Sequence, residues 1–189
     1  MGGIFDPLWN SHGWKPAMPP VQDENKIAAR LKAADQSALK TLYCRYYPPI
    51  KAFLFHRTRN IQLAEDLAQD TFFRLWESRE KIQPGKSLKS YLYQIANHLF
   101  IDYTRRVKVE RRYTRHRSVH SNPSSTIDMD ISVQTAVDHL PEKYRVVFIL
   151  SRAEGFSYRE IAQTLNVSIK TVEHRIYRAL DLLKKELED

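Results

Sequence analysis

The apolar residues of this chain recur every three or four positions along most of its length, and this spacing is the feature that most limits its fold. It matches the 3.6-residue period of a helix that buries one side. The run 61–77 shows it most clearly, because its apolar residues form one stripe: Leu63, Ala64, Leu67, Ala68, Phe72, Leu75 and Trp76. No stretch alternates apolar and polar residues as a half-buried strand does. The sequence therefore predicts an all-α protein.

The helical pattern is interrupted twice, and the interruptions predict two small helical domains joined by a flexible linker. The opening segment carries four of the nine prolines and has no period. A second break is rich first in Lys and Arg and then in Ser, which is typical of a linker. The predicted organisation is a flexible lead at 1–22, a first domain at 23–106, a basic and Ser-rich linker at 107–131 and a second domain at 132–189.

Two local signals predict helix limits in the first domain. Proline lacks a backbone N–H, so Pro48 and Pro49 are expected to kink or interrupt the helix that contains them. Ser87 follows a turn and is expected to cap a helix that runs from Leu88 to about Arg105.

The charge balance favours a polyanionic partner and the composition disfavours several other classes. Lys and Arg number 30 against 22 for Asp and Glu, which leaves a net charge of +8. The single cysteine, Cys44, cannot form an internal disulfide, and no apolar run reaches the ~18 residues of a membrane span. We therefore expect a cytoplasmic protein without membrane insertion.

Enzyme chemistry finds little support in the sequence. No Ser/His/Asp constellation or Gly-rich phosphate loop is present. His116 and His120 are four residues apart, but no acidic or thiol partner stands at metal-ligand spacing. We expect no catalytic residue, no metal and no cofactor.

The segment 155–187 has the pattern of a helix-turn-helix. Ser157 and Glu160 form a capping box, Asn166 suits the left-handed end of the first helix, and Ser168 can cap the second. The polar positions of the second helix can then face a major groove, where their side chains pair with base edges and phosphates. The predicted DNA-binding residues are Ser168, Lys170, Thr171, Glu173, His174, Arg175, Tyr177 and Arg178. An ordinary helical hairpin with a solvated face is the alternative.

A second candidate surface lies opposite the apolar stripe of 61–77. Asp66, Gln69 and Asp70 share it with Phe73. An acidic face is usually only solvated surface, but an exposed phenylalanine within it indicates a docking patch for a protein partner.

The segment 82–103 has aromatic residues interleaved with basic and amide groups. Rings stack on unpaired bases and amides bond base edges, so this pattern fits single-stranded nucleic acid. Some of these aromatic residues must also fill the core, which is the competing interpretation. The predicted strand-contacting residues are Ile82, Lys86, Lys89, Tyr93 and Asn97.

The order of these motifs resembles bacterial sigma factors. The segments DQSAL (35–39), AEDLAQDTF (64–72) and YLYQIAN (91–97) are similar to sigma region 2, and LPEKYR (140–145) with the helix-turn-helix is similar to region 4. With only these two regions, the chain resembles the extracytoplasmic-function (ECF) group of the sigma-70 family.

The resemblance implies a promoter-reading subunit of RNA polymerase. Region 2 would bind the β′ clamp helices through Asp66, Gln69 and Asp70, and grip the non-template strand of the −10 element through the 82–86 loop and Asn97. Region 4 would contact the β flap and read duplex DNA of the −35 element. Members of this group are often held by an anti-sigma factor, so the resemblance implies one as a partner.

Three features depart from the family's pattern, and one alternative function stays open. Tyr91 stands where the family usually has Trp, Glu173 stands where a basic or small residue is common, and the lead has no counterpart. A plain helix-turn-helix regulator would explain the second domain, but it leaves the acidic and aromatic helices of the first domain unused.

Overall fold

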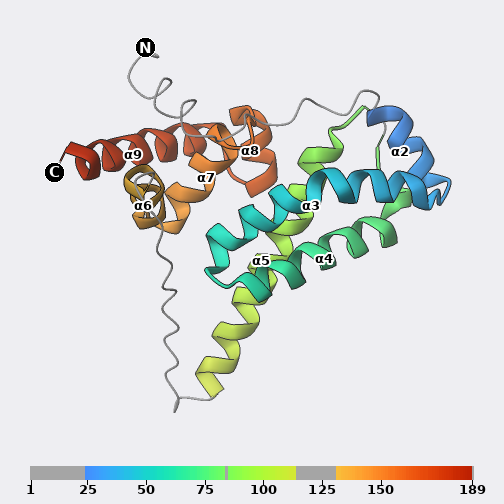
Figure 1. Cartoon of the computed structure of the whole chain (residues 1–189), viewed down its shortest axis with the longest axis horizontal. Helices are drawn as coiled ribbons and strands as arrows, with labels where there is room; N and C mark the ends of the chain where they lie inside the picture. Colours follow the sequence, from blue (N-terminus) through green and yellow to red (C-terminus); the bar gives the residue numbers. More distant parts are fainter. Residues whose placement is uncertain (1–23, 84, 114–130, 189) are drawn as a thin grey trace. The chain divides into compact units, whose positions relative to one another are not determined.

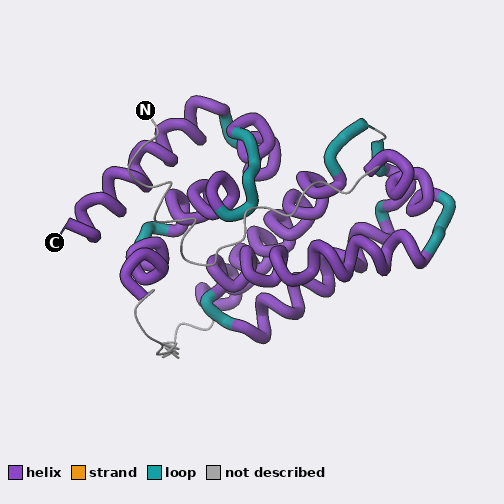
Figure 2. Tube along the Cα trace, turned by 45° about the horizontal axis from the view of Figure 1, so that its top comes forward, coloured by secondary structure: helices purple, strands orange, loops and turns teal. Residues whose placement is uncertain are grey.

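The computed structural model describes residues 24–83, 85–113 and 131–188, and within these ranges the chain is entirely helix, turn and loop (Figures 1 and 2). The all-α prediction is confirmed. The chain divides into two compact units, one within 21–125 and the other within 126–189. The predicted lead, most of the predicted linker, and with them His116 and His120, lie outside the described residues.

The first unit consists of four α-helices and one 3-10 helix around a shared core. Helices α3 and α4 pack side by side, and α5 packs against both. The largest fully buried side chains of this unit come from all four α-helices and include Leu31, Phe53, Leu75 and Tyr93. The elements are α2 (Glu24–Lys32), α3 (Gln36–Thr58), α4 (Ile61–Glu77), η1 (Arg79–Lys81) and α5 (Leu88–Tyr113).

Helix α3 continues through Pro48 and Pro49, so of the two predicted effects, a kink or an interruption, the interruption does not occur. An interior proline costs a helix about 3 kcal/mol or more because one hydrogen bond is lost and the ring crowds the preceding turn. Tyr46 and Ile50, on either side of the pair, are 4% and 0% exposed. Their burial against the neighbouring helices offsets the local cost.

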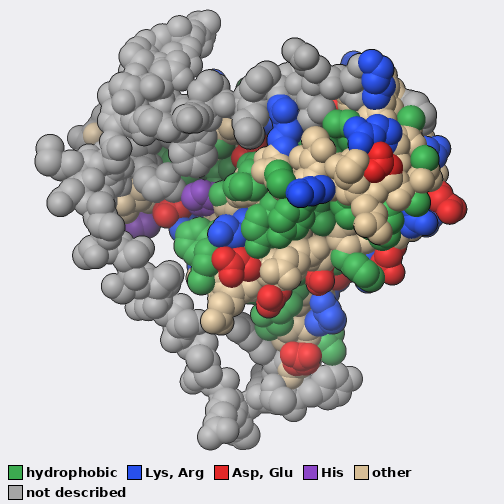
Figure 3. Space-filling model, turned by 45° about the vertical axis from the view of Figure 1, so that its right-hand side comes forward, with side chains coloured by type: hydrophobic (Ala, Val, Ile, Leu, Met, Phe, Trp, Pro, Cys, Tyr) green, Lys and Arg blue, Asp and Glu red, His purple; other side chains and the backbone are tan. Residues whose placement is uncertain are grey.

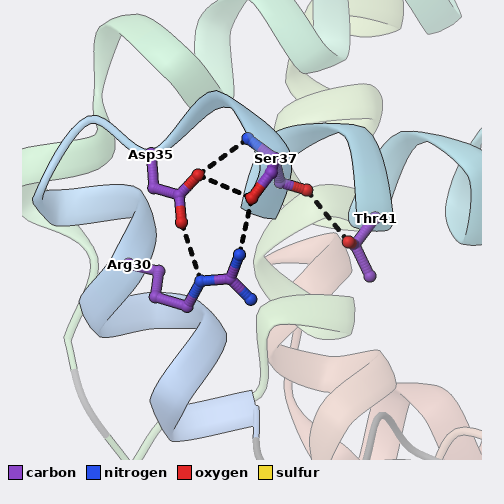
Figure 4. Close-up of polar contacts among 4 residues, drawn as sticks. All are labelled: Arg30, Asp35, Ser37 and Thr41. Carbon is purple, nitrogen blue, oxygen red and sulfur yellow. Dashed lines mark hydrogen bonds and ion pairs between the residues drawn. The ribbon is translucent and has the colours of Figure 1, made fainter.

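Asp35 organises the turn between α2 and α3 (Figure 4). Its carboxylate accepts hydrogen bonds from the Ser37 backbone N–H at 2.8 Å and from the Ser37 hydroxyl at 2.7 Å. Arg30 Nε donates to the second carboxylate oxygen at 2.8 Å. Hydrogen bonds from Ser37 and Arg30 stabilise the charged form and lower the pKa of Asp35 from 3.8 to about 2.

Helix α2 also holds the loop that leads into α5. Asn25 Oδ1 accepts from the Gly85 N–H at 2.8 Å, and Glu24 Oε2 accepts from the Leu88 N–H at 3.0 Å. Ser87 Oγ accepts from the Ser90 N–H at 3.2 Å, which confirms the predicted cap. Ser87, directly before the helix, and Glu24, 64 residues before Leu88, both accept backbone N–H groups of the first turn of α5 and so fix where it begins.

Helix α5 ends at Tyr113, eight residues beyond the predicted end at Arg105. The residues from 107 onward are predicted to be linker because that segment is rich in Lys and Arg. Lys and Arg have high helix propensity, and an established helix adds further residues at little cost. The first part of the predicted linker is therefore helical.

The second unit contains α6 (Ile131–His139), α7 (Glu142–Arg152), α8 (Tyr158–Leu165) and α9 (Ile169–Glu188). Helix α9 packs against each of the other three. Arg145, only 9% exposed, donates to the carbonyls of Asp138 at 2.8 Å and Leu140 at 3.2 Å. It thereby satisfies carbonyl groups at the end of α6 that have no partner within that helix.

Candidate nucleic-acid and partner-binding surfaces

The start of α8 has the predicted capping box. The Ser157 N–H donates to Glu160 Oε2 at 2.8 Å, and the Glu160 N–H donates to Ser157 Oγ at 3.3 Å. These reciprocal bonds satisfy two backbone donors that the helix itself cannot satisfy. The start of α8 is therefore determined within four residues of sequence.

The turn between α8 and α9 also follows the prediction. Asn166 adopts the left-handed conformation, with φ 53° and ψ 52°, and the Val167 N–H donates to the Ala162 carbonyl at 3.0 Å. Ser168 then caps α9, because its Oγ accepts from the Thr171 N–H at 3.1 Å. The chain ends one helix and begins the next within three residues.

Helices α8 and α9 are held together at a tightly packed crossing. Ile161 and Val172 are completely buried, Ile176 is 3% exposed, and the small Ala162 is 7% exposed. This packing fixes which side of α9 remains outside.

The outward side of α9 carries most of the predicted DNA-binding residues. Tyr177 is 68% exposed, and Thr171 and Arg175 are half-buried. The exposed members of the predicted set are Ser168, Lys170, Glu173, His174, Tyr177 and Arg178. All eight side chains therefore retain contact with solvent.

Two further residues of this surface were not predicted. Arg159 and Gln163, both exposed on α8, line an open groove together with Asn166 and Ser168. Their spacing of four places them on one side of α8, and this signal was available in the sequence.

Helix α4 presents the predicted acidic surface. Asp66, Gln69 and Asp70 are exposed, and Phe73 beside them is 60% exposed. On the face of the molecule drawn in Figure 3, hydrophobic side chains are interspersed with acidic and basic ones. An exposed phenylalanine beside two carboxylates combines apolar area with charge, as protein-binding surfaces do.

Three of the five predicted strand-contacting residues are buried in the core of the first unit. Ile82 is 4% exposed, Tyr93 is 0% and Asn97 is 2%. Tyr93 lies with its ring centroid 5.2 Å from that of Phe53, on the side of α5 that also buries Leu92. Tyr93 and Asn97 are four residues apart, so both point into the unit.

Asn97 is engaged by an arginine from another helix. Arg57 Nη1 donates a hydrogen bond to Asn97 Oδ1, and the Arg57 guanidinium lies 4.0 Å from the centroid of the Phe100 ring. The side chain therefore connects α5 to the end of α3. In this arrangement it does not reach solvent.

Lys86, Lys89 and His98 remain accessible in this part of the unit. Lys86 and His98 are exposed and Lys89 is half-buried. His98 is not among the predicted strand-contacting residues, because the neighbouring Asn97 has the side-chain amide expected of a residue that bonds a base edge. A difference of one position turns a helical side chain by about 100°, which decides between core and surface.

Comparison with known families covers both units. The family model for sigma-70 region 2 matches residues 42–109, and the one for sigma-70 region 4 matches residues 130–183. The chain is 35% identical to the ECF RNA polymerase sigma factor SigE of Mycolicibacterium smegmatis over 180 residues, which cover 89% of this chain and 70% of that protein. The chain belongs to the ECF group of the sigma-70 family.

Further relatives of this sigma factor agree. It is 30% identical to the sigma factor CarQ of Myxococcus xanthus, over 84% of this chain and 94% of the other. Among solved structures, the sigma factor RpoE of Bartonella quintana, in complex with the anti-sigma factor NepR, is 27% identical, with a TM-score of 0.68. That match covers 79% of this chain and 96% of RpoE.

Membership assigns the general function. This sigma factor is a promoter-recognising transcription initiation factor and is not an enzyme. Most of α3, all of α4 and most of α5 fall within the region 2 match, and α6, α7, α8 and most of α9 fall within the region 4 match. None of the helices described by the structure is long and apolar enough to cross a membrane.

Proposed function

We propose that this sigma factor reads duplex promoter DNA, the −35 element, through the exposed side of α9. The observation that carries this proposal is the double-capped turn, which leaves Lys170, His174 and Arg178 exposed while Val172 and Ile176 are buried. In helix-turn-helix proteins the second helix enters the major groove, and its first residues contact base edges. Lys170 and Arg175 supply donors for guanine, and the Ser168 end supplies backbone N–H groups for a phosphate.

We propose that the acidic surface of α4 docks on core RNA polymerase, at the β′ clamp helices, with region 4 contacting the β flap. Asp66, Asp70 and Phe73 are all exposed, and the ion pairs among the described residues involve neither of the two carboxylates. Exposed carboxylates around an apolar side chain fit a basic surface that also has an apolar centre.

We propose that Lys86, Lys89 and His98 contact the non-template strand of the −10 element. Lys86 lies in the loop held by Asn25, and on α5 His98 is exposed and Lys89 is half-buried. Tyr91 stays half-buried with its hydroxyl 3.0 Å from Ser78 Oγ, so part of its ring is available for stacking on a base. Asn97 and Tyr93 support this surface from the core.

The test combines the full chain with core RNA polymerase. A pool of random duplexes is enriched for those that the reconstituted enzyme binds, and run-off transcription from the enriched sequence is measured. Wild-type protein should direct specific transcripts. Asp66→Ala should lower the affinity for core polymerase, whereas Glu80→Ala, which also removes an exposed carboxylate of region 2, should leave it unchanged. Equal affinity of both variants would contradict the docking surface.

We also propose a cytoplasmic location and an anti-sigma partner. The related RpoE structure was solved with the anti-sigma factor NepR bound. Since polymerase and promoter DNA are in the cytoplasm, a sigma factor acts there. Affinity purification of the chain from its own cells should recover polymerase subunits and one further small protein. Recovery of polymerase alone under uninduced conditions would argue against the anti-sigma partner.

A further inference from the structure

Glu173 is an exposed carboxylate in the part of α9 that is proposed to read DNA. It follows the completely buried Val172 by one position, which turns its side chain by about 100° away from the core. Two other carboxylates of α9 are ion-paired, since Asp181 lies 3.3 Å from an arginine of the same helix and Glu186 lies 2.8 Å from His139. Within the described ranges, Glu173 forms neither an ion pair nor a side-chain hydrogen bond. Its charge is therefore available to an outside partner.

Two exposed apolar side chains flank Glu173 on α9. Ile169, Glu173 and Tyr177 follow one another at intervals of four, so they form one row along the helix. Ile169 is 42% exposed and Tyr177 is 68% exposed. When base pairs cover this row, the two apolar side chains exclude water from the carboxylate between them. A carboxylate that loses its water needs a hydrogen-bond donor, because an unpaired buried charge is costly.

The chemistry of the base edges limits which donor can meet this carboxylate. In the major groove only cytosine N4 and adenine N6 carry amino donors, whereas guanine and thymine present acceptor oxygens. Adenine also places the acceptor N7 beside N6, and this nitrogen repels a carboxylate oxygen. Cytosine has only a C–H group beside its amino group. Among the four bases, cytosine therefore matches a carboxylate best.

Lys170 complements Glu173 on the same helix. The two residues are three positions apart, so their side chains are neighbours on the surface of α9. Both are exposed, and no ion pair between them is found in the part of the chain that the structure describes. The Lys170 ammonium is a donor for the O6 of the guanine that pairs with cytosine. An acceptor and a donor side by side match the two halves of one C·G pair.

We propose that Glu173 selects cytosine at one position of the promoter element read by α9, by accepting a hydrogen bond from its N4 amino group. This inference rests on the proposed reading of duplex DNA by α9 and adds the residue that determines one accepted base. The carboxylate repels the phosphates of every duplex and the acceptor groups of the wrong bases. The hydrogen bond to cytosine offsets this repulsion only on the correct sequence, which is how a repulsive group increases specificity.

The test compares the sequences enriched from random duplexes by core polymerase carrying wild-type chain or Glu173→Gln. Wild type should require cytosine at one position, and any other base there should weaken binding about 5- to 140-fold. Glu173→Gln keeps the size of an exposed side chain, so the fold is retained. Its amide pairs with adenine N6 and N7, so the preferred base at that position should change from cytosine to adenine while the other positions stay the same.

Glu173→Ala and a modified base give a second measurement. Replacing the selected cytosine by 2-pyrimidinone, which lacks the amino group, should weaken wild-type binding and cause no further loss for Glu173→Ala. On unrelated duplexes Glu173→Ala should bind more tightly than wild type, because the repulsion from DNA is removed.

Glu186→Gln is the matched control. Glu186 is an exposed carboxylate of the same helix, and an amide there can keep the hydrogen bond to His139. This variant should keep the wild-type base preference and the wild-type affinity for unrelated duplexes.

Three outcomes would overturn the selection of cytosine by Glu173 while leaving the reading of duplex DNA by α9 intact. The first is the same base preference for wild type and Glu173→Gln at every position. The second is a base other than cytosine at the position where the two differ. The third is equally tighter binding of Glu173→Ala to promoter and unrelated duplexes, which limits Glu173 to repulsion of phosphates. If Arg175→Ala has no effect on the preference for promoter over unrelated duplex, the proposed function fails instead.

Discussion

Replacing Asn97 with alanine separates a structural role of this residue from direct contact with DNA. The substitution removes the acceptor of the hydrogen bond from Arg57, a residue 40 positions away on another helix. A hydrogen bond to a charged group contributes about 1.5–3 kcal/mol net. Arg57 is only half-buried and keeps its contact with the Phe100 ring at 4.0 Å, so the expected loss lies in the lower half of that range.

We expect a loss of about 2 kcal/mol, which raises the population of the locally opened first unit about 30-fold. The measurement is amide hydrogen exchange on the full chain, read by mass spectrometry for peptides of each helix. Peptides of α3 and α5 should exchange faster. Peptides of α9, which lies in the other unit, should be unchanged.

His98→Ala is the control, because the adjacent side chain is exposed. It should change local stability by less than about 0.5 kcal/mol. It should nevertheless impair promoter opening, detected by permanganate reactivity of unpaired thymines. If Asn97→Ala left hydrogen exchange unchanged and abolished strand binding, Asn97 would be a direct DNA contact, and the reasoning from its burial would be refuted.

Three further predictions concern the turn and capping residues and the DNA-reading helix. Asn166→Ala should destabilise region 4 by about 1 kcal/mol in thermal unfolding, because alanine has a Cβ that crowds the backbone at a φ of 53° and lacks the polar group with which asparagine compensates. Asn166→Gly should be nearly neutral, because glycine adopts this φ without a steric cost. Asp35 has its pKa lowered from 3.8 to about 2, so its stabilisation is present above its ordinary pKa and is lost as the pH falls toward 2. The melting temperature of wild type should therefore fall more steeply than that of Asp35→Asn between pH 4.5 and 2. Parallel curves of melting temperature against pH for the two proteins would argue against this effect. Arg175→Ala should weaken promoter duplex binding by about 1–3 kcal/mol in a titration if it contacts a base, and unchanged affinity would place its side chain outside the groove.

The helix-turn-helix could be predicted from the sequence in detail because its determinants are local. The capping box of Ser157 and Glu160 spans four residues, and the cap of Ser168 on Thr171 spans the same distance. Asn166 adopts its left-handed conformation through a backbone preference of its own. The exposed side of α9 follows directly, because two helices joined by this turn can bury only one side of each.

The interior of the first unit could not be predicted in the same way. Tyr93 and Asn97 have the chemistry of base-contacting residues, and only the packing of α5 on α3 shows that they face inward. The continuation of α3 through Pro48 and Pro49 likewise depends on burial of Tyr46 and Ile50, which a local rule for proline does not include.

The amino-acid sequence by itself determined the helical class, the position and caps of the helix-turn-helix, and the acidic surface of α4. These depend on periodicity and on hydrogen bonds between residues a few positions apart. The tertiary structure alone decided which polar side chains of α5 are accessible, and it alone brought Arg57 of α3 to Asn97 of α5. Such contacts join residues tens of positions apart, and their geometry is set by how whole helices pack.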